Sequence, residues 1–356
     1  MYYQCNTSVT SSLYFCSVNR EQTISSLTLY YEQRKSRKNH QDCQLGEIHH
    51  PRSAPGICIC CTVKGLKTNH DYLVESMESK SQKEIQVEEK ITDLVTKIVE
   101  KQTSGDDLPI RLWNNLRNHQ EIAAIQNYAN MVSIGRLGLN DHGPVHMKTV
   151  CRNALKMLSI LYTAGMQTSL EKENIGTFAD SVAAVMIASL LHDSGMAIGR
   201  SGHELYSAII SYPIIEKVLL QLLPEDSDIL RRTIIRSIAI EGIVGHMATH
   251  PVHSVEAGII LIADGCDMTK GRARIPLEIP SKPTEGDIHK YSANSIEKVK
   301  IGRGNERPLK IEIHMRAEVG FFQVEEVLIP KIQSSPAKSM LELYAGVEGE
   351  EMKRYM

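Results

Sequence analysis

Two nearly continuous apolar stretches of this sequence end in ionisable side chains, and this feature most constrains what the chain can fold into. Residues 182–191 are almost entirely apolar and lead directly into His192 and Asp193. Residues 259–263 are also apolar and stop at Asp264. Segments of this kind are expected to be buried, and a buried carboxylate or imidazole is costly unless it is paired or binds a metal. The sequence therefore predicts buried helices that deliver polar groups to an interior site.

The spacing of apolar residues predicts a mostly helical chain. Residues 82–101 place apolar side chains at helical spacing among Glu and Lys, which predicts an amphipathic helix. Further helices are predicted over residues 109–132, 143–164, 177–192, 203–222, 226–248 and 252–266. Beyond residue 275 the pattern changes. Strand-like alternation at 295–301 and 309–315 is followed by a helical pattern at 321–332 and a strand or helix at 340–347.

These patterns divide the chain into three predicted parts. Residues 1–76 are rich in Ser, Thr and polar runs, and they offer little apolar surface to offset the entropy of ordering. Two explanations for this low-order amino-terminal arm stay open: translation begins at Met77, or the arm is disordered or accessory. Residues 77–275 form the helical domain, and residues 276–356 form a small α+β domain with a charged tail.

The composition excludes several classes of protein. Lys and Arg number 40 and Asp and Glu 42, so the net charge of −2 provides no general attraction to nucleic acid or an anionic membrane. No stretch approaches the roughly 18 continuous apolar residues of a membrane span. The first residues lack the basic and apolar regions of a secretory signal. We therefore expect a cytoplasmic protein without a membrane or nucleic-acid partner.

Histidine is concentrated in the helical domain. Seven of the 14 histidines lie between His142 and His253. A lone buried histidine is usually an ordinary core residue, and an isolated aspartate after an apolar helix is usually a cap. A set that recurs near helix ends or on apolar helix faces instead indicates a metal site, and its members are His142, His146, His192, Asp193, His203, His246 and Asp264.

The order of these residues resembles the HD-domain superfamily of metal-dependent phosphohydrolases. The family pattern of His, then His-Asp, then Asp is matched by His146, His192-Asp193 and Asp264. The segment Ser-Leu-Leu-His192-Asp193-Ser-Gly is similar to the leucine-rich helix that ends in the family's HD dipeptide. The resemblance covers about residues 110–275. It implies an HD-type helical bundle, here with a small α+β carboxyl-terminal appendage and a poorly structured amino-terminal arm.

The same resemblance implies a set of metal ligands. His203 and His246 match the two additional histidines of the two-metal subgroup. The family pattern then assigns His146, His192, Asp193 and Asp264 to one metal and His203 and His246 to the other, with Asp193 bridging. The resemblance to that subgroup implies Mn or Fe, and the imidazole and carboxylate ligands also fit Co, Ni or Zn. No Gly-Tyr-Pro motif follows His246, so cyclic-di-GMP is disfavoured as the substrate.

The expected catalytic residues are Asp193 and His142. Residues 140–146 resemble a segment of the cyclic-nucleotide phosphodiesterases whose first histidine protonates the leaving oxygen, which implies that His142 is a general acid. His142 shares a helix face with His146 only if the helix already includes residues 141–142, and Pro144 instead indicates a start near Gly143. Asp267 is expected to orient a ligand.

The expected substrate-binding residues are Lys270, Arg272 and Arg274, which follow Asp264 closely. Basic side chains that leave the metal end of a helix could clamp phosphates. An ordinary solvated basic turn explains them equally well, and the sequence leaves both interpretations open.

The sequence therefore predicts a metal-dependent phosphohydrolase. Its substrate is expected to be a nucleotide or another small phosphomonoester, phosphodiester or anhydride. Two alternatives stay open: an HD-type di-iron oxygenase, and a non-catalytic regulator that senses a nucleotide. The carboxyl-terminal unit of about 75 residues is marginal alone, so it is expected to pack on the helical domain or to form a homodimer contact.

Overall fold

The computed structural model describes residues 80–269 and 288–356 of the chain. Contacts within the chain divide it into two units, residues 1–65 and 66–356, and all described residues belong to the second unit. The predicted amino-terminal arm over residues 1–76 lies outside the described residues. The predicted domain boundaries at 77 and 276 stay predictions.

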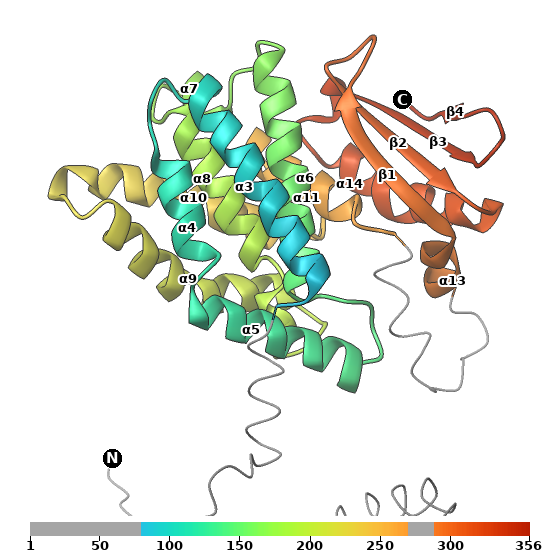
Figure 1. Cartoon of the computed structure of the whole chain (residues 1–356), viewed down its shortest axis with the longest axis horizontal. Coiled ribbons are helices and arrows are strands. Elements are labelled where there is room, and N and C mark those ends of the chain that lie inside the picture. Colours follow the sequence, from blue (N-terminus) through green and yellow to red (C-terminus); the bar gives the residue numbers. More distant parts are fainter. Residues whose placement is uncertain (1–79, 270–287) are drawn as a thin grey trace, which may run out of the picture. The chain divides into compact units, whose positions relative to one another are not determined.

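The first part of the described chain is helical, as the sequence predicts (Figure 1). Its longer helices are α3 (Gln82–Gln102), α4 (Leu108–Leu116), α5 (Gln120–Met131), α6 (Pro144–Thr163), α8 (Phe178–Leu191), α9 (His203–Leu222), α10 (Ile229–Gly245) and α11 (Val255–Gly265). Shorter turns connect them: η1 (Val132–Arg136), α7 (Ser169–Lys172), η2 (Ser194–Ala197) and η3 (Asp226–Asp228).

Helix α8 is the centre of the helical part. Every one of its 14 residues is buried, which agrees with the apolar run in the sequence. Thr177 and Asp180 form a capping box at its amino terminus, in which each side chain accepts a hydrogen bond from the other's backbone N–H. Helices α4, α6, α10 and α11 pack around α8. The buried end of α8 therefore carries His192 into the middle of the bundle.

The prediction of one helix over residues 109–132 is wrong. Helix α4 ends at Leu116 and α5 begins at Gln120. His119 interrupts the helix because its backbone is extended, and its ring Nδ1 accepts a hydrogen bond from the N–H of Ile122 at 3.4 Å. A histidine in the N-cap role is not among the usual start signals, and the segment contains no Gly or internal Pro to indicate the break.

The carboxyl-terminal part contains a four-stranded sheet, which confirms the predicted α+β appendage (Figure 1). Its elements are α13 (Ile288–Ser295), β1 (Ile296–Arg303), β2 (Leu309–Met315), η4 (Glu318–Gly320), η5 (Gln323–Leu328), α14 (Ile329–Gln333), η6 (Lys338–Met340), β3 (Leu341–Val347) and β4 (Lys353–Arg354). The order is β1-β2-β3-β4, with β2 and β3 parallel and the other two pairs antiparallel.

The parallel pairing of β2 and β3 explains how the sheet comes to pack on the helices. Two adjacent parallel strands need a crossover connection, and here η4, η5 and α14 supply it. The turn η5 and helix α14 both pack on α11. Strand β2 buries alternate residues, from Leu309 to Met315, in the same apolar cluster that contains the core of the helical part. The crossover therefore lies against the helix that ends at Asp264.

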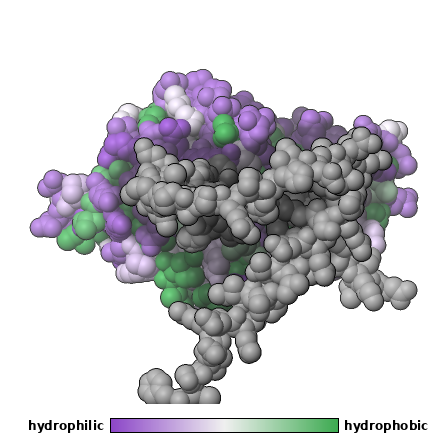
Figure 2. Space-filling model, turned by 60° about the horizontal axis from the view of Figure 1, so that its bottom comes forward, coloured by the Kyte–Doolittle hydropathy of each residue, from purple (hydrophilic) through white to green (hydrophobic). Residues whose placement is uncertain are grey.

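One group of apolar side chains stays exposed on α9, at Ile198 just after η2, and at the first two residues of α10. It comprises Ile198, Leu205, Tyr206, Ile209, Tyr212, Leu220, Ile229 and Leu230. In Figure 2, hydrophobic surface is visible at the left edge and at the lower centre of the molecule. By length and composition, α9 is the single helix among the described residues that could cross a membrane. This is weak evidence, because core helices of soluble proteins pass the same test.

Candidate metal centre

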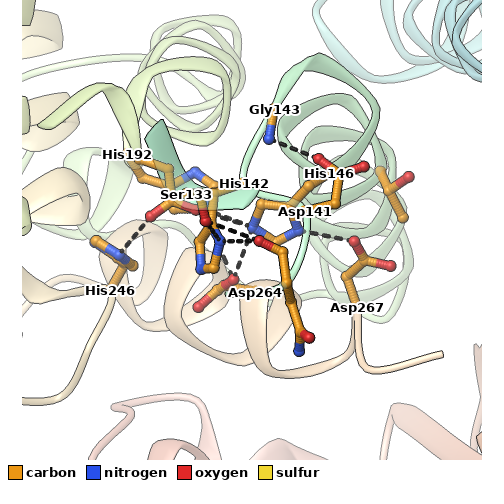
Figure 3. A network of polar contacts seen from close by, with 12 residues as sticks. Ser133, Asp141, His142, Gly143, His146, His192, His246, Asp264 and Asp267 are labelled. Carbon is orange, nitrogen blue, oxygen red and sulfur yellow. Dashed lines mark hydrogen bonds and ion pairs between the residues drawn. The ribbon is translucent and has the colours of Figure 1, made fainter. Parts of the chain in front are cut away.

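Six ionisable side chains converge inside the helical part, and each comes from the end of a helix. His146 lies in the first turn of α6, His203 opens α9, and Asp264 lies in the last turn of α11. His192 is the C-cap of α8, followed directly by Asp193, and His246 is the C-cap of α10. None of the six is more than 7% exposed. Figure 3 shows several of these side chains pointing toward one another from different helices.

The first group is formed by His146, His192 and Asp264. Their ligand atoms all lie within 4.8 Å of one another. The Nε2 atoms of the two histidines are 3.2 Å apart, and Oδ1 of Asp264 lies 3.2 Å from Nε2 of His146. Oδ2 of Asp193 is 3.2 Å from Nε2 of His146 and 3.4 Å from Nε2 of His192.

The second group adjoins the first through the same aspartate. Nε2 of His203 lies 3.1 Å from Nε2 of His246. The other carboxylate oxygen of Asp193, Oδ1, is 3.2 Å from His203 and 3.4 Å from His246. His192, Asp193 and His246 also satisfy the distance requirement for a shared cation. Asp193 thus faces one pair of histidines with each oxygen.

The hydrogen bonds of the outer ring nitrogens fix the proton positions. Nδ1 lies 2.9 Å from the Ser189 carbonyl in His192 and 2.9 Å from the Arg200 carbonyl in His203. In His246 it lies 2.7 Å from the Ile243 carbonyl. A carbonyl oxygen only accepts hydrogen bonds, so Nδ1 carries the proton in these three rings and, in the neutral ring, Nε2 presents a lone pair.

The Nε2 lone pairs of neighbouring histidines face one another, which favours a bound cation between them. Two neutral imidazoles whose Nε2 atoms are about 3.1–3.2 Å apart cannot hydrogen-bond to each other when neither Nε2 carries a proton. A cation that both nitrogens ligate converts this repulsion into binding. Asp193 Oδ2 accepts no hydrogen bond among the described residues, which leaves it available as a ligand. The donor set of imidazole nitrogens and carboxylates fits a transition metal.

The charge states of the carboxylates suit this role. Burial by itself raises the pKa of Asp193, but the neighbouring His192, His142, His146 and His203 outweigh it and hold the pKa well below its usual range. Burial also opposes ionisation of Asp264, and Lys331 and the histidines again outweigh it. Burial lowers the pKa of His246 to about 4 in spite of Asp193. At neutral pH the centre therefore offers two carboxylates and a neutral His246.

Two residues outside the ligand set hold it in place. Oδ2 of Asp267 lies 2.7 Å from Nδ1 of His146, where it can orient this ring, as the sequence led us to expect. Lys331, on α14, forms an ion pair with Oδ2 of Asp264 and donates a hydrogen bond to the His246 carbonyl at 2.9 Å. Sequence reasoning missed Lys331 because it lies 67 positions beyond Asp264 on a helix of ordinary pattern.

His142 lies beside the centre but outside the helix of His146. Helix α6 begins at Pro144, so the condition for a shared helix face is not met. The two rings nevertheless approach, with centroids 5.9 Å apart. Nδ1 of His142 is 2.6 Å from the Asn140 carbonyl and 2.8 Å from the Ser133 hydroxyl. Its proton therefore sits on Nδ1, and Nε2 is the nitrogen that can exchange a proton.

A cavity of about 370 Å³ opens onto these residues. The helical part contributes His142, Asp193, Arg200, His246, Asp264 and Asp267 to its lining, and the carboxyl-terminal part contributes Ala293, Gln323, Val327 and Lys331. The predicted substrate residues Lys270, Arg272 and Arg274 lie outside the described residues. Their role, like metal binding by the six ligand residues, stays a prediction.

Comparison with known proteins gives one informative relative. The chain is 38% identical over 251 residues to the uncharacterized protein MJ1020 of Methanocaldococcus jannaschii. The match covers 70% of this chain and 94% of the archaeal protein. No protein-family model matches the sequence. No solved structure matches it.

Proposed function

The chain belongs to the same family as the uncharacterized M. jannaschii protein MJ1020, and we propose that it is an HD-type metal-dependent phosphohydrolase. Its proposed substrates are nucleotides and other small phosphate esters or anhydrides. The relative's name assigns no activity, so the proposal rests on the chemistry of the site.

The observation that supports the proposal most is the double role of Asp193. Its two oxygens face two separate histidine pairs, each with Nε2 atoms about 3.1–3.2 Å apart. This is the arrangement expected for two cations that share one carboxylate. Asp264 adds a second carboxylate to the side of His146 and His192, so the ligands on both sides come from the chain itself.

The residues divide the work of hydrolysis between them. His146, His192, Asp193, His203, His246 and Asp264 would hold a pair of divalent cations, which would neutralise charge on a phosphoryl group and lower the pKa of a bound water. Asp267 fixes the ring of His146, and three backbone carbonyls fix the other three ligand rings. His142 keeps one proton on Nδ1, so it would pass a proton to the leaving oxygen from Nε2, in the doubly protonated form of the ring. The ligand set fits a transition metal, and the HD-type resemblance favours manganese or iron.

Metal analysis and a phosphatase screen of the purified full-length chain test the proposal. We expect close to two transition-metal ions per chain and release of phosphate from a panel of nucleotides and small phosphate esters. Asp193→Ala should abolish this release while the circular dichroism spectrum stays helical. His250→Ala is a matched control, because His250 lies on the turn after α10 and is not in the ligand set.

Three results would contradict the proposal. Retained hydrolysis in Asp193→Ala removes the bridging role. Two metal ions that still bind in a His203→Ala/His246→Ala variant remove these two histidines from the ligand set. Hydrolysis should also proceed without oxygen when manganese is supplied, whereas strict dependence on oxygen and iron favours an oxygenase.

A further inference from the structure

The cavity at the metal centre has a wall that comes from the carboxyl-terminal part. Lys331 lies on the crossover between the parallel strands β2 and β3, and this crossover packs against α11. The side chain of Lys331 is 9% exposed, and it lines the cavity together with Asp193, His246 and Asp264. A buried ammonium is costly unless it is paired, so its position needs an explanation.

The partners of Lys331 account for part of its hydrogen-bonding capacity. An ammonium group has three N–H donors. Among the described residues, Oδ2 of Asp264 and the carbonyl of His246 take two of them. The third donor stays available to a group inside the cavity that Lys331 lines.

The lining of the cavity carries the carboxylates of Asp193, Asp264 and Asp267 and the cations of Lys331 and Arg200, so an anionic group is favoured there once the proposed metal ions offset the carboxylates. Among the described residues, Asp264 is the one ion-pair partner of Lys331, and the carbonyl of His246 is uncharged. A phosphate that reaches Asp193 and His246 from the cavity also comes close to Lys331, because all three residues line the same space. Lysine is a common point-charge ligand for phosphate oxygens.

We propose that Lys331 binds the phosphate of the substrate and that the carboxyl-terminal part thereby completes the active site. This inference rests on the proposed phosphohydrolase function, which defines the anion. It assigns a substrate-binding residue to a segment that lies far from the HD-type pattern in the sequence.

The test compares Lys331→Met with Lys338→Met in the metal-loaded full-length protein. Met keeps most of the length of the side chain and removes its charge, and Lys338 is an exposed lysine seven positions away on the same connection to β3. We expect Lys331→Met to raise KM and the Kd for inorganic phosphate at least tenfold, with a smaller change in kcat. Lys338→Met should change neither quantity.

A purely structural role of Lys331 predicts a different pattern. If Lys331 only positions Asp264, metal content at limiting metal falls, while KM and phosphate Kd at saturating metal stay as in the unsubstituted protein. That result overturns the proposal. Lys331→Arg keeps the charge and the ion pair, so it should restore most of the phosphate binding, and it decides the question if Lys331→Met fails to fold.

The phosphate measurement separates this inference from the proposed function. If the unsubstituted protein hydrolyses no phosphate compound in the screen, the phosphohydrolase proposal fails. The Kd for inorganic phosphate then still shows whether Lys331 binds the anion. Equal phosphate affinity in the unsubstituted protein and Lys331→Met contradicts the role of Lys331 in either case.

Discussion

Each of the four clustered histidines uses one ring nitrogen to hold its orientation and turns the other toward the candidate metal centre. Three rings donate to backbone carbonyls, and these carbonyls cannot be removed by side-chain substitution. His146 differs because its Nδ1 contacts a side-chain carboxylate, that of Asp267. Its orientation and basicity are therefore open to a simple mutational test.

Asp267→Asn should weaken metal binding about 10- to 100-fold, because the amide oxygen still accepts a hydrogen bond but no longer carries the charge that raises the basicity of His146. The affinity is measured by competition with a chelator of known strength. Asp226→Asn, an exposed aspartate on η3, is the control. Unchanged affinity in Asp267→Asn means that the contact with His146 does not support the centre.

At the scale of single residues, the sequence predicted the site where burial and charge conflict. His192, Asp193 and Asp264 stand out because they end apolar runs, and the structure places all three in the cluster. The sequence around Lys331 shows no such conflict, because the residues of the short helix α14 do not form a long apolar run that ends in a charge. Its partner Asp264 is defined only by the tertiary fold.

Among the elements, the short turn η2 fixes the distance between the HD dipeptide and α9. Gly195 donates its backbone N–H to the Ser207 hydroxyl at 2.8 Å. A Cβ atom at Gly195 would lie 2.0 Å from the carbonyl oxygen of His203. Such a distance is far below van der Waals contact, so the glycine is what lets His203 approach Asp193.

Gly195→Ala should therefore push α9 away and disturb the His203 side of the centre. We expect a loss of about 1–3 kcal/mol in the free energy of unfolding, as for other overpacked cores, and weaker binding of one metal ion. Chemical denaturation and metal stoichiometry measure the two effects. Gly199→Ala is the matched control, because no atom lies within 4 Å of its added Cβ. Equal stability of the two variants would show that η2 adjusts without cost.

Helix α3 is attached to α6 by a buried cluster of charges. Lys148 on α6 forms ion pairs with Glu84 and with Glu88, the latter at 2.5 Å, and Lys80 adds a second contact to Glu88. Burial by itself raises the pKa of Glu88, but hydrogen bonds from Lys148 and Lys80 outweigh it and lower the pKa. The cluster therefore stabilises the fold only while Glu88 is ionised.

The pH dependence of stability follows from the lowered pKa of Glu88. A carboxyl whose pKa is lower in the folded state contributes stability above the unfolded value near 4.5, and the contribution is lost as pH falls through the folded pKa. Glu88→Gln should cost about 1–3 kcal/mol at pH 7 and should cost progressively less below pH about 4. Urea denaturation at a series of pH values measures this. A cost that is the same at pH 3 and pH 7 would contradict the ionic role of Glu88.

At this scale the sequence predicted most helices but not all of their ends. The apolar period and Pro144 located α6, whereas the break between α4 and α5 depends on the unusual cap at His119. The crossover elements η5 and α14 were predicted as one helical segment over residues 321–332. Their contact with α11, which decides the place of Lys331, is a long-range packing result that no local pattern contains.

The described part of the molecule has one main apolar core that continues from the helices into the sheet. The same cluster contains Ile187 of α8, Ile262 of α11, Leu328 of η5 and Ile313 of β2. The carboxyl-terminal part therefore stabilises the helical part and also lines its cavity through Lys331. This arrangement predicts that the two parts depend on each other.

Two deletions of similar length test this dependence. A chain that ends at Pro276 loses the whole sheet and Lys331, which exposes apolar side chains of α11 that pack against η5 and α14. We expect this chain to aggregate or to change its oligomeric state, and to lose phosphate binding. Size-exclusion chromatography with light scattering measures the first effect and calorimetry the second.

The matched control is a chain that begins at Met77. It removes almost as many residues, but it keeps Lys80 and the charge cluster of α3, and all proposed ligands begin at His142 or beyond. Its metal content, unfolding transition and hydrolysis should equal those of the full chain. Loss of activity in this control would assign a function to residues 1–76. A soluble, metal-binding chain that ends at Pro276 would instead show that the helical part is stable without the sheet. The apolar contacts of α11 with η5 and α14 would then contribute little to its free energy of unfolding.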